Sequence, residues 1–113
     1  MSATTALAAP TFSALGEANR LRIVELLREG PLSVGDIVTR LGLRQPQVSK
    51  HLRVLDESNL VSVEVRHRHR IYRLRPEPFS AVAEWAESFE ALWEVRLDSL
   101  GRFLRAPDGG DGE

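Results

Sequence analysis

The sequence predicts a mainly helical domain that carries one small β-hairpin. Three observations predict this class. Residues 18–58 contain three segments with apolar residues at helical spacing, residues 60–74 contain two short β-prone runs around a basic tip, and residues 78–105 form one long amphipathic pattern. A chain of 113 residues with 42% hydrophobic content can bury one modest core. We therefore expect a single domain, in which residues 11–77 form the region that carries the function.

The first strong helical pattern covers Ala18–Glu29, where Leu21, Val24 and Leu27 share one face. Gly30-Pro31 ends it, because glycine suits a left-handed cap and proline cannot continue a helix. The preceding residues 1–10 are small and polar and show no such pattern. We expect them to be a flexible tail.

A second helix is expected after Ser33, whose hydroxyl can cap it, and it ends at Gly42. A third helix follows from about Gln45 to Ser58, with Pro46 tolerated in its first turn. In this helix Val48, Leu52 and Leu55 fall within about 60° of one another and define the buried face. The pattern is a helix, a tight turn containing glycine, and a second helix.

The opposite face of the third helix is polar and basic. A helix that reads base edges needs short polar groups near its N-terminus and cations nearby for phosphates. A glutamine can pair with adenine and a lysine can donate to guanine. An ordinary solvated face is the alternative interpretation. The candidate DNA-binding residues here are Arg44, Gln45, Gln47, Ser49, Lys50 and Arg53.

Leu60–Val65 and Ile71–Leu74 are predicted to pair as a hairpin whose tip is Arg66–Arg70. Alternation along the tip predicts that Arg66, Arg68 and Arg70 lie on one side and that His67 and His69 lie on the other. Five consecutive cation-capable residues favour contact with phosphate or with a minor groove. The alternatives are a solvated loop tip and a metal site at His67 and His69, for which only Glu64 offers a third ligand.

The final helix, expected over residues 78–105, has an apolar sector about 140° wide that a domain of this size cannot cover alone. A second copy of the chain is the simplest cover. Trp85, Phe89 and Trp93 have an alternative interpretation as an aromatic ligand pocket at the seam between two copies. Residues 106–113 are predicted to be disordered. The expected dimerisation residues are Phe12, Val82, Trp85, Phe89, Trp93, Leu97, Leu100 and Leu104.

Charge is distributed unevenly along the chain, although the formal net charge is only -1. Arg40–Arg75 holds nine basic and three acidic residues, whereas Pro76–Glu113 holds three basic and nine acidic residues. Nucleic-acid affinity depends on the local field, so the middle of the chain is the expected binding surface.

Several function classes are excluded by what the chain lacks. It has no cysteine, which excludes disulfides, thiolate metal sites and cysteine nucleophiles. Ser49 and His51 lie about 160° apart around their helix, so a triad with Asp56 is excluded, and His51 is expected to pack. No signal peptide or membrane span is evident, and we expect a cytoplasmic protein that is not an enzyme, with no cofactor and no bound metal.

These elements together form a winged helix-turn-helix, and their amino-acid sequences resemble those of the ArsR-type family of repressors. The resemblance implies a homodimer joined through its terminal helices, which binds double-stranded DNA at a partly palindromic operator. The segments that carry this resemblance are Leu15–Val24, Leu32–Ile37, Gln45–Leu55 and Ile71–Leu74.

The chain departs from the family at its inducer sites. Ser33 and Gly35 stand where metal-sensing members place cysteines, and the last helix has no histidine. The resemblance therefore implies a non-metal-sensing subgroup. Arg44 replaces the usual cap serine of the third helix. The predicted hairpin would be the wing of the fold, and its tip lacks the usual glycine. Two alternative functions stay open: a winged-helix adaptor for protein partners, and a sensor of a metal or a small apolar ligand.

Overall fold

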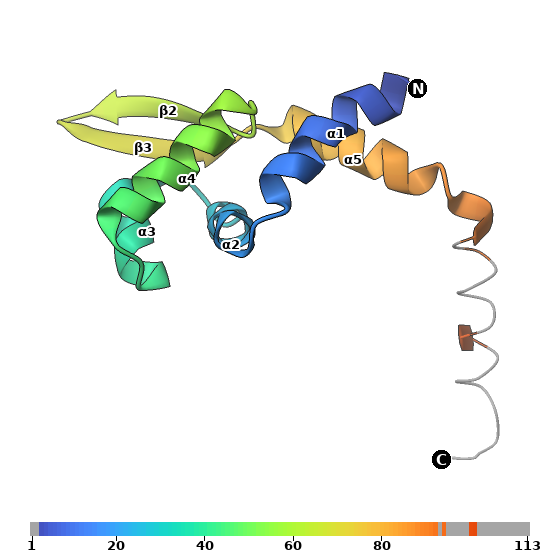
Figure 1. Cartoon of the computed structure of the whole chain (residues 1–113), viewed down its shortest axis with the longest axis horizontal. Coiled ribbons are helices and arrows are strands. Elements are labelled where there is room, and N and C mark those ends of the chain that lie inside the picture. Colours follow the sequence, from blue (N-terminus) through green and yellow to red (C-terminus); the bar gives the residue numbers. More distant parts are fainter. Residues whose placement is uncertain (1–2, 93, 95–99, 102–113) are drawn as a thin grey trace, which may run out of the picture.

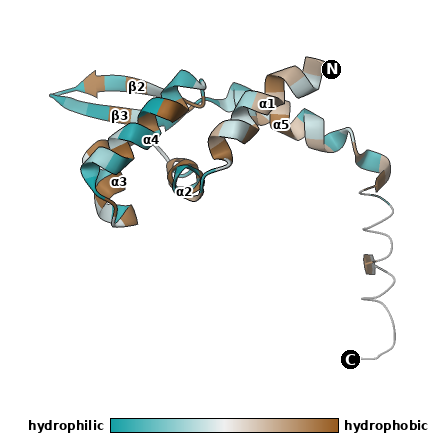
Figure 2. Cartoon of the chain, viewed as in Figure 1, coloured by the Kyte–Doolittle hydropathy of each residue, from teal (hydrophilic) through white to brown (hydrophobic). Residues whose placement is uncertain are grey.

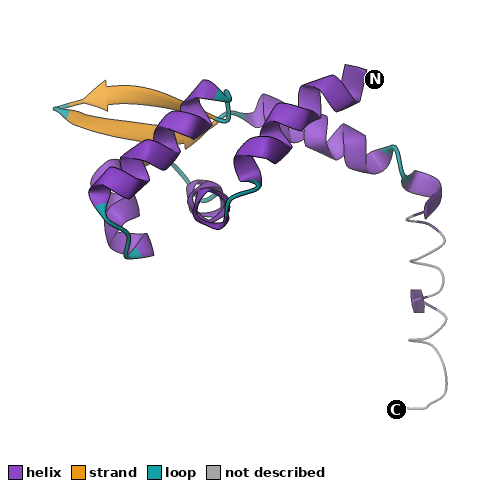
Figure 3. Cartoon of the chain, in the orientation of Figure 1, coloured by secondary structure: helices purple, strands orange, loops and turns teal. Residues whose placement is uncertain are grey.

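The computed structural model describes residues 3–92, 94, 100 and 101. Within this part of the chain, the fold comprises five α-helices and a small antiparallel sheet of three strands (Figures 1 and 3). The hairpin projects from one end of the molecule, and helices α1 and α5 lie at the other. Hydrophilic residues predominate along the hairpin, whereas α1 is mostly apolar (Figure 2). The predicted mainly helical class with one hairpin is confirmed.

Helix α1 covers Ala3–Leu15, so the expected flexible tail over residues 1–10 is wrong for residues 3–10. The buried residues of this helix are Ala8, Thr11 and Ala14, three positions apart. This narrow stripe of small side chains lets α1 pack closely along α5. The helix is thus stabilised by tertiary packing, and no broad apolar face marks it in the sequence.

Helices α2 (Ala18–Leu27), α3 (Val34–Leu41) and α4 (Gln45–Glu57) form the predicted helix-turn-helix. Ser33 Oγ accepts the backbone N–H of Asp36 at 3.1 Å, which caps α3 as predicted. Gly42 ends α3 with a φ of 67°, a left-handed conformation that glycine adopts without strain.

The core lies between the helix-turn-helix and the base of the sheet. The stripe Val48, Leu52 and Leu55 of α4 is completely buried, as predicted. Ile23 of α2 and Ile37 of α3 are also completely buried and belong to the same cluster. This burial fixes the rotation of α4 about its own axis.

The sheet has the order β1-β3-β2, with β2 (Val61–Arg66) and β3 (His69–Leu74) forming the predicted hairpin. Strand β1 is only Leu32–Ser33 and pairs with Tyr72 and Ile71 of β3. The sequence does not predict β1, because two residues are too few to show alternation. This strand connects the start of α3 to the middle of β3.

The turn of the hairpin is tighter than the sequence predicts. Only His67 and Arg68 form it, with φ values of 50° and 72°, and Arg66 pairs directly with His69. Arg66 and His69 therefore share one face of the hairpin, and Arg70 shares the opposite face with Val65. The expected separation of three arginines from two histidines is wrong, because the two-residue turn changes the alternation.

Helix α5 covers Pro76–Glu87, so the expected single helix over residues 78–105 is wrong. The helix stops at Ser88, whose hydroxyl donates to the carbonyl of Trp85 at 2.6 Å. Helical geometry resumes at Glu90. The apolar spacing continues through the break, which explains why the sequence suggested one helix. The predicted disordered tail, residues 106–113, lies outside the described residues.

The strained turn generates a stability prediction. Arg68→Gly should raise the free energy of unfolding by about 1 kcal/mol, because a left-handed conformation costs a side-chain-bearing residue about that much. Urea denaturation of the two proteins measures the difference. Arg66→Gly is the matched control, since it removes the same charge from a strand position and should lower stability. A loss of stability in Arg68→Gly would contradict this account.

Candidate nucleic-acid interface

Helix α4 presents the predicted polar face to solvent. Arg44, Gln45, Gln47, Ser49, Lys50 and Arg53 are all exposed. Gln47, Lys50 and Arg53 lie on the side of the helix away from its buried stripe, and Ser49 lies on the flank of that stripe. Arg44 and Gln45 are exposed because they lie at the N-terminal end of the helix. An exposed helix end with amide, hydroxyl and ammonium groups can enter a major groove and contact base edges.

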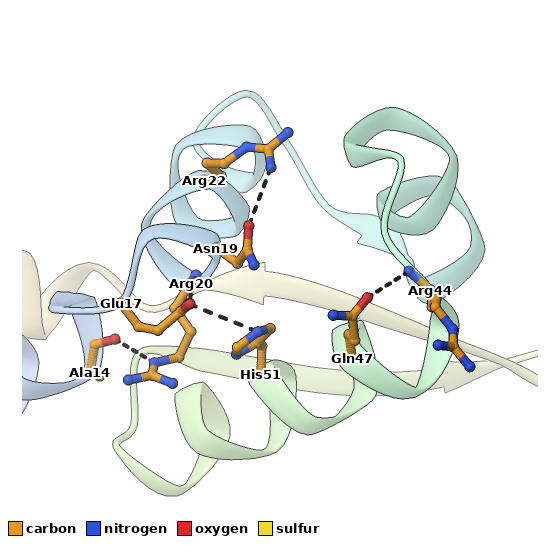
Figure 4. A network of polar contacts seen from close by, with 8 residues as sticks. All are labelled: Ala14, Glu17, Asn19, Arg20, Arg22, Arg44, Gln47 and His51. Atoms are coloured by element: carbon orange, nitrogen blue, oxygen red, sulfur yellow. Dashed lines mark hydrogen bonds and ion pairs between the residues drawn. The ribbon is translucent and has the colours of Figure 1, made fainter.

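The N-terminus of α4 is capped by Gln47 instead of by Arg44. The side-chain oxygen of Gln47 accepts the backbone N–H of Arg44 at 3.2 Å (Figure 4). The Arg44 guanidinium has only donors and cannot cap a helix N-terminus, so it stays available for an anion. The amide nitrogen of Gln47 is likewise available as a donor, while its oxygen holds the first turn.

Two hollows form a continuous trough between α4 and strand β3. One, of about 310 Å³, is lined by residues that include Ser49, Arg53 and Arg70. The other, of about 370 Å³, shares Ser49 and Arg70 with it and adds Gln45 and Arg68. The trough thus brings side chains of the predicted helix surface together with side chains of the predicted tip. Its cations come from two separate segments of the chain.

The opposite face of the hairpin holds a small ionic cluster that the sequence analysis missed. The Glu64 carboxylate lies 3.1 Å from the Arg66 guanidinium and 3.3 Å from that of Arg73. Glu64 and Arg66 are neighbours on one face of β2, whereas Arg73 approaches diagonally from β3. Only the strand register, which the sequence left open, reveals that Arg73 belongs to the basic surface.

His51 contacts the start of helix α2. Its Nε2 lies 3.8 Å from the Glu17 carboxylate, which also accepts the backbone N–H of Arg20 at 2.9 Å (Figure 4). Arg20 in turn donates to the carbonyl of Ala14 at 2.6 Å. His51 is mostly buried, which confirms that it packs. The network joins the end of α1, the start of α2 and the middle of α4.

Hydrogen bonding and charge act together on Glu17. The backbone N–H of Arg20 lowers the pKa of the Glu17 carboxyl below its ordinary value of 4.5, and nearby His51 adds to this effect against partial desolvation. The ionised carboxylate is therefore the form that caps α2.

Two absences concern residues 3–92, 94, 100 and 101. No group of three or more metal-ligating side chains is arranged to hold an ion there, at His67 and His69 or elsewhere. Within the same residues, no helix is both long enough and apolar enough to cross a membrane.

A helix-turn-helix, a basic hairpin beside its second helix and a trough of cations between them define a winged-helix DNA-binding protein. The comparisons with known proteins give the family. A sequence model described as "bacterial regulatory protein, arsR family" matches residues 17–63. The chain belongs to this family and is a DNA-binding transcriptional regulator, not an enzyme.

Individual relatives agree with this assignment. The HTH-type transcriptional regulator Rv2034 of Mycobacterium tuberculosis is 38% identical over 93 residues, covering 82% of this chain and 84% of the relative. The arsenical resistance operon repressor of Escherichia coli is 33% identical, covering 83% and 79%. The crystal structure of HlyU from Vibrio cholerae superposes with a TM-score of 0.66 at 30% identity, covering 79% of this chain and 97% of that one.

The Glu17 contacts generate a prediction on pH. Because its pKa is lowered in the folded state, Glu17 stabilises the fold fully above its unfolded pKa and loses this effect as the pH falls through the folded value. Glu17→Gln should therefore be less stable than the unmodified chain at pH 7, and the difference should shrink below about pH 4.5. Urea denaturation between pH 3 and 7 measures it.

The matched control for this measurement is Glu25→Gln, which removes an exposed carboxylate from the last turn of the same helix. An identical pH dependence in the two variants would assign the effect to net charge and contradict a specific role for Glu17.

Proposed function

We propose that this regulator is a repressor that binds a partly palindromic operator as a homodimer, with α4 in the major groove of each half-site. The trough between α4 and β3 carries the proposal. It brings Arg53 of the helix and Arg70 of the hairpin together in one hollow, which Asp56 also lines. A DNA backbone strand that passes between the major and minor grooves would meet both cations.

The exposed residues divide by their chemistry into two roles. Gln45, Gln47, Ser49 and Lys50 would contact base edges, while Arg44 and Arg53 would hold phosphates on either side. In the wing, Arg68 and His67 at the tip would enter the minor groove. Arg70 would contact the strand beside α4, and Arg66 and His69 would lie on the outer face.

The dimer proposal rests on α1 and α5. Phe12 meets Trp85 edge to face with ring centroids 4.9 Å apart, and Trp85 meets Phe89 in the same way. Part of the apolar sector is thus covered by α1 of the same chain. Phe12 and Phe89 nevertheless remain about 40% exposed and Leu92 is 60% exposed, which leaves an apolar surface for a second copy.

The other proposed contacts of the dimer complete this surface. Val82 is half-buried on α5 and Leu100 is exposed, whereas Trp93, Leu97 and Leu104 lie outside the described residues. A two-fold axis through this surface would place two α4 helices on successive major grooves, about 34–36 Å apart.

We also propose that the chain belongs to a non-metal-sensing subgroup. Ser33 caps α3 through its hydroxyl, and Gly35 lies in the first turn of that helix. These two positions therefore form the start of α3 and supply no thiolate. One relative is named for arsenical resistance, which describes that protein. Binding of a small apolar effector to this chain stays an alternative hypothesis.

Base reading by Gln47 can be tested with Gln47→Glu. This variant keeps an oxygen to accept the Arg44 N–H but replaces an amide suited to adenine with a carboxylate suited to cytosine. The preferred base at one position of each half-site should change, with about tenfold discrimination or more. Selection of bound fragments from a random DNA pool measures this preference.

Arg70→Gln is the contrasting variant in the same assay. It should weaken binding to all sequences and flatten the salt dependence by about one phosphate contact, without changing the preferred bases. An unchanged preference in Gln47→Glu would contradict the reading role. A failure of the unmodified chain to select any sequence would favour the adaptor alternative.

Self-association can be tested with Phe89→Glu. A charge placed on the exposed apolar surface should raise the dimer dissociation constant by about tenfold or more, because the carboxylate would be desolvated in the interface. Sedimentation equilibrium measures the constant. Ala83→Glu adds the same charge at an exposed position of α5 and should remain dimeric. A monomeric unmodified chain at micromolar concentration would contradict the proposal.

A further inference from the structure

Glu64 is the one acidic residue of the hairpin sequence 61–74, which otherwise carries four arginines and two histidines. Its carboxylate lies between two guanidiniums. Oε2 accepts from Arg66 at 3.1 Å and Oε1 accepts from Arg73 at 3.3 Å. Both oxygens are therefore engaged, and each arginine gives one terminal nitrogen to the pair.

The strand register explains why these three side chains meet. Residues 62, 64 and 66 of β2 share the outer face of the hairpin with residues 69, 71 and 73 of β3. Arg66 is two residues along the same strand from Glu64. Arg73 is opposite Ser62 and so lies on the diagonal from Glu64. Arg70 faces the other way, into the trough, and does not belong to this cluster.

The carboxylate changes what the outer face offers to DNA. Two guanidiniums alone would present two positive charges to the phosphates, and the carboxylate reduces this to one. Glu64 also lies within a Debye length of any phosphate that Arg66 or Arg73 could contact. A phosphate would therefore have to compete for the guanidiniums and would experience repulsion from Glu64.

We infer that Glu64 limits the affinity of the wing for the DNA backbone by holding Arg66 and Arg73. This inference rests on the proposed function, since it requires that the wing contacts DNA. Glu64 is a positioning residue, because it acts through the two arginines without contacting DNA itself. Its effect falls on phosphate contacts, so it weakens binding to all sequences alike and leaves the base preference to α4.

If Glu64 instead ordered the two arginines for DNA binding, it would raise the affinity of the wing for DNA. All three side chains are about half exposed, and pairs of this kind are worth little as structural restraints. Ordering two exposed side chains therefore gains little for DNA binding. Competition between Glu64 and phosphate for the two guanidiniums is therefore the larger effect.

Glu64→Gln tests the inference, because the amide keeps the shape of the side chain and removes its charge. Binding to both random and selected DNA at 0.1 M salt should strengthen by about threefold to tenfold, and the salt dependence should steepen by up to about one phosphate contact. Fluorescence anisotropy with labelled duplexes at several salt concentrations measures both quantities. The control Glu84→Gln makes the same change in net charge on α5, at the other end of the molecule, and should change affinity less than twofold.

The Arg66→Gln/Arg73→Gln pair shows whether the effect passes through the arginines. In that background, Glu64→Gln should strengthen binding by less than twofold. A full effect there, or weaker binding in Glu64→Gln alone, would overturn the inference and leave the proposed function intact. If the double variant binds DNA as the unmodified chain does, the inference fails, whereas the proposed wing contacts of Arg68 and Arg70, which lie outside this cluster, are left intact. Urea denaturation of each variant identifies any change that comes from lost stability.

Discussion

The burial of one stripe on α4 is the constraint on which the rest of the structure depends. A helix of thirteen residues is marginal in water on its own, so its formation requires tertiary contacts. Val48, Leu52 and Leu55 supply them and are wholly removed from solvent. Because the stripe has a fixed angular position, the polar residues on the other side of the helix are turned outward. The geometry of the reading surface is thus a consequence of the core.

The molecule separates two kinds of surface at its two ends. Exposed basic residues are concentrated on α4 and the hairpin, whereas α1 and the segment after α5 carry exposed apolar residues such as Phe12, Phe89 and Leu92. Arg75 connects the two halves at the start of α5, since its backbone N–H donates to the Leu60 carbonyl and its Nε donates to the Val61 carbonyl. A contact that moves α5 would therefore also act on the base of the hairpin. The overall charge of -1 gives no indication of this separation.

The helix-turn-helix was predictable because its signals are local. The spacing of Val48, Leu52 and Leu55, the Ser33 cap and the Gly42 stop each act within a few residues. What the sequence could not show depends on distant partners. Helix α1 is stabilised by α5, and the two-residue strand β1 exists only because β3 lies beside it.

The candidate surface shows the same division between local and distant signals. All eleven predicted DNA-binding side chains are exposed, as a basic polar surface requires, although exposure alone does not test their roles. Their division between the two faces of the wing was not predictable, because it depends on where the turn falls. With no glycine or asparagine at the tip, nothing in the sequence marks His67 and Arg68 as the turning residues. Glu64 and Arg73 could be paired only once that register was known.

The hairpin extends well beyond the core that supports its base. Val61 is completely buried, but Val63 is 38% exposed and Val65 is 69% exposed, although all three lie on the same face. The free energy needed to open the ladder must therefore fall from base to tip, and amide hydrogens near the turn should exchange fastest. A wing built in this way can follow grooves of different width while α4 keeps its position. On the proposed function, shape adaptation and base reading would then fall to two parts of the surface that differ in local stability.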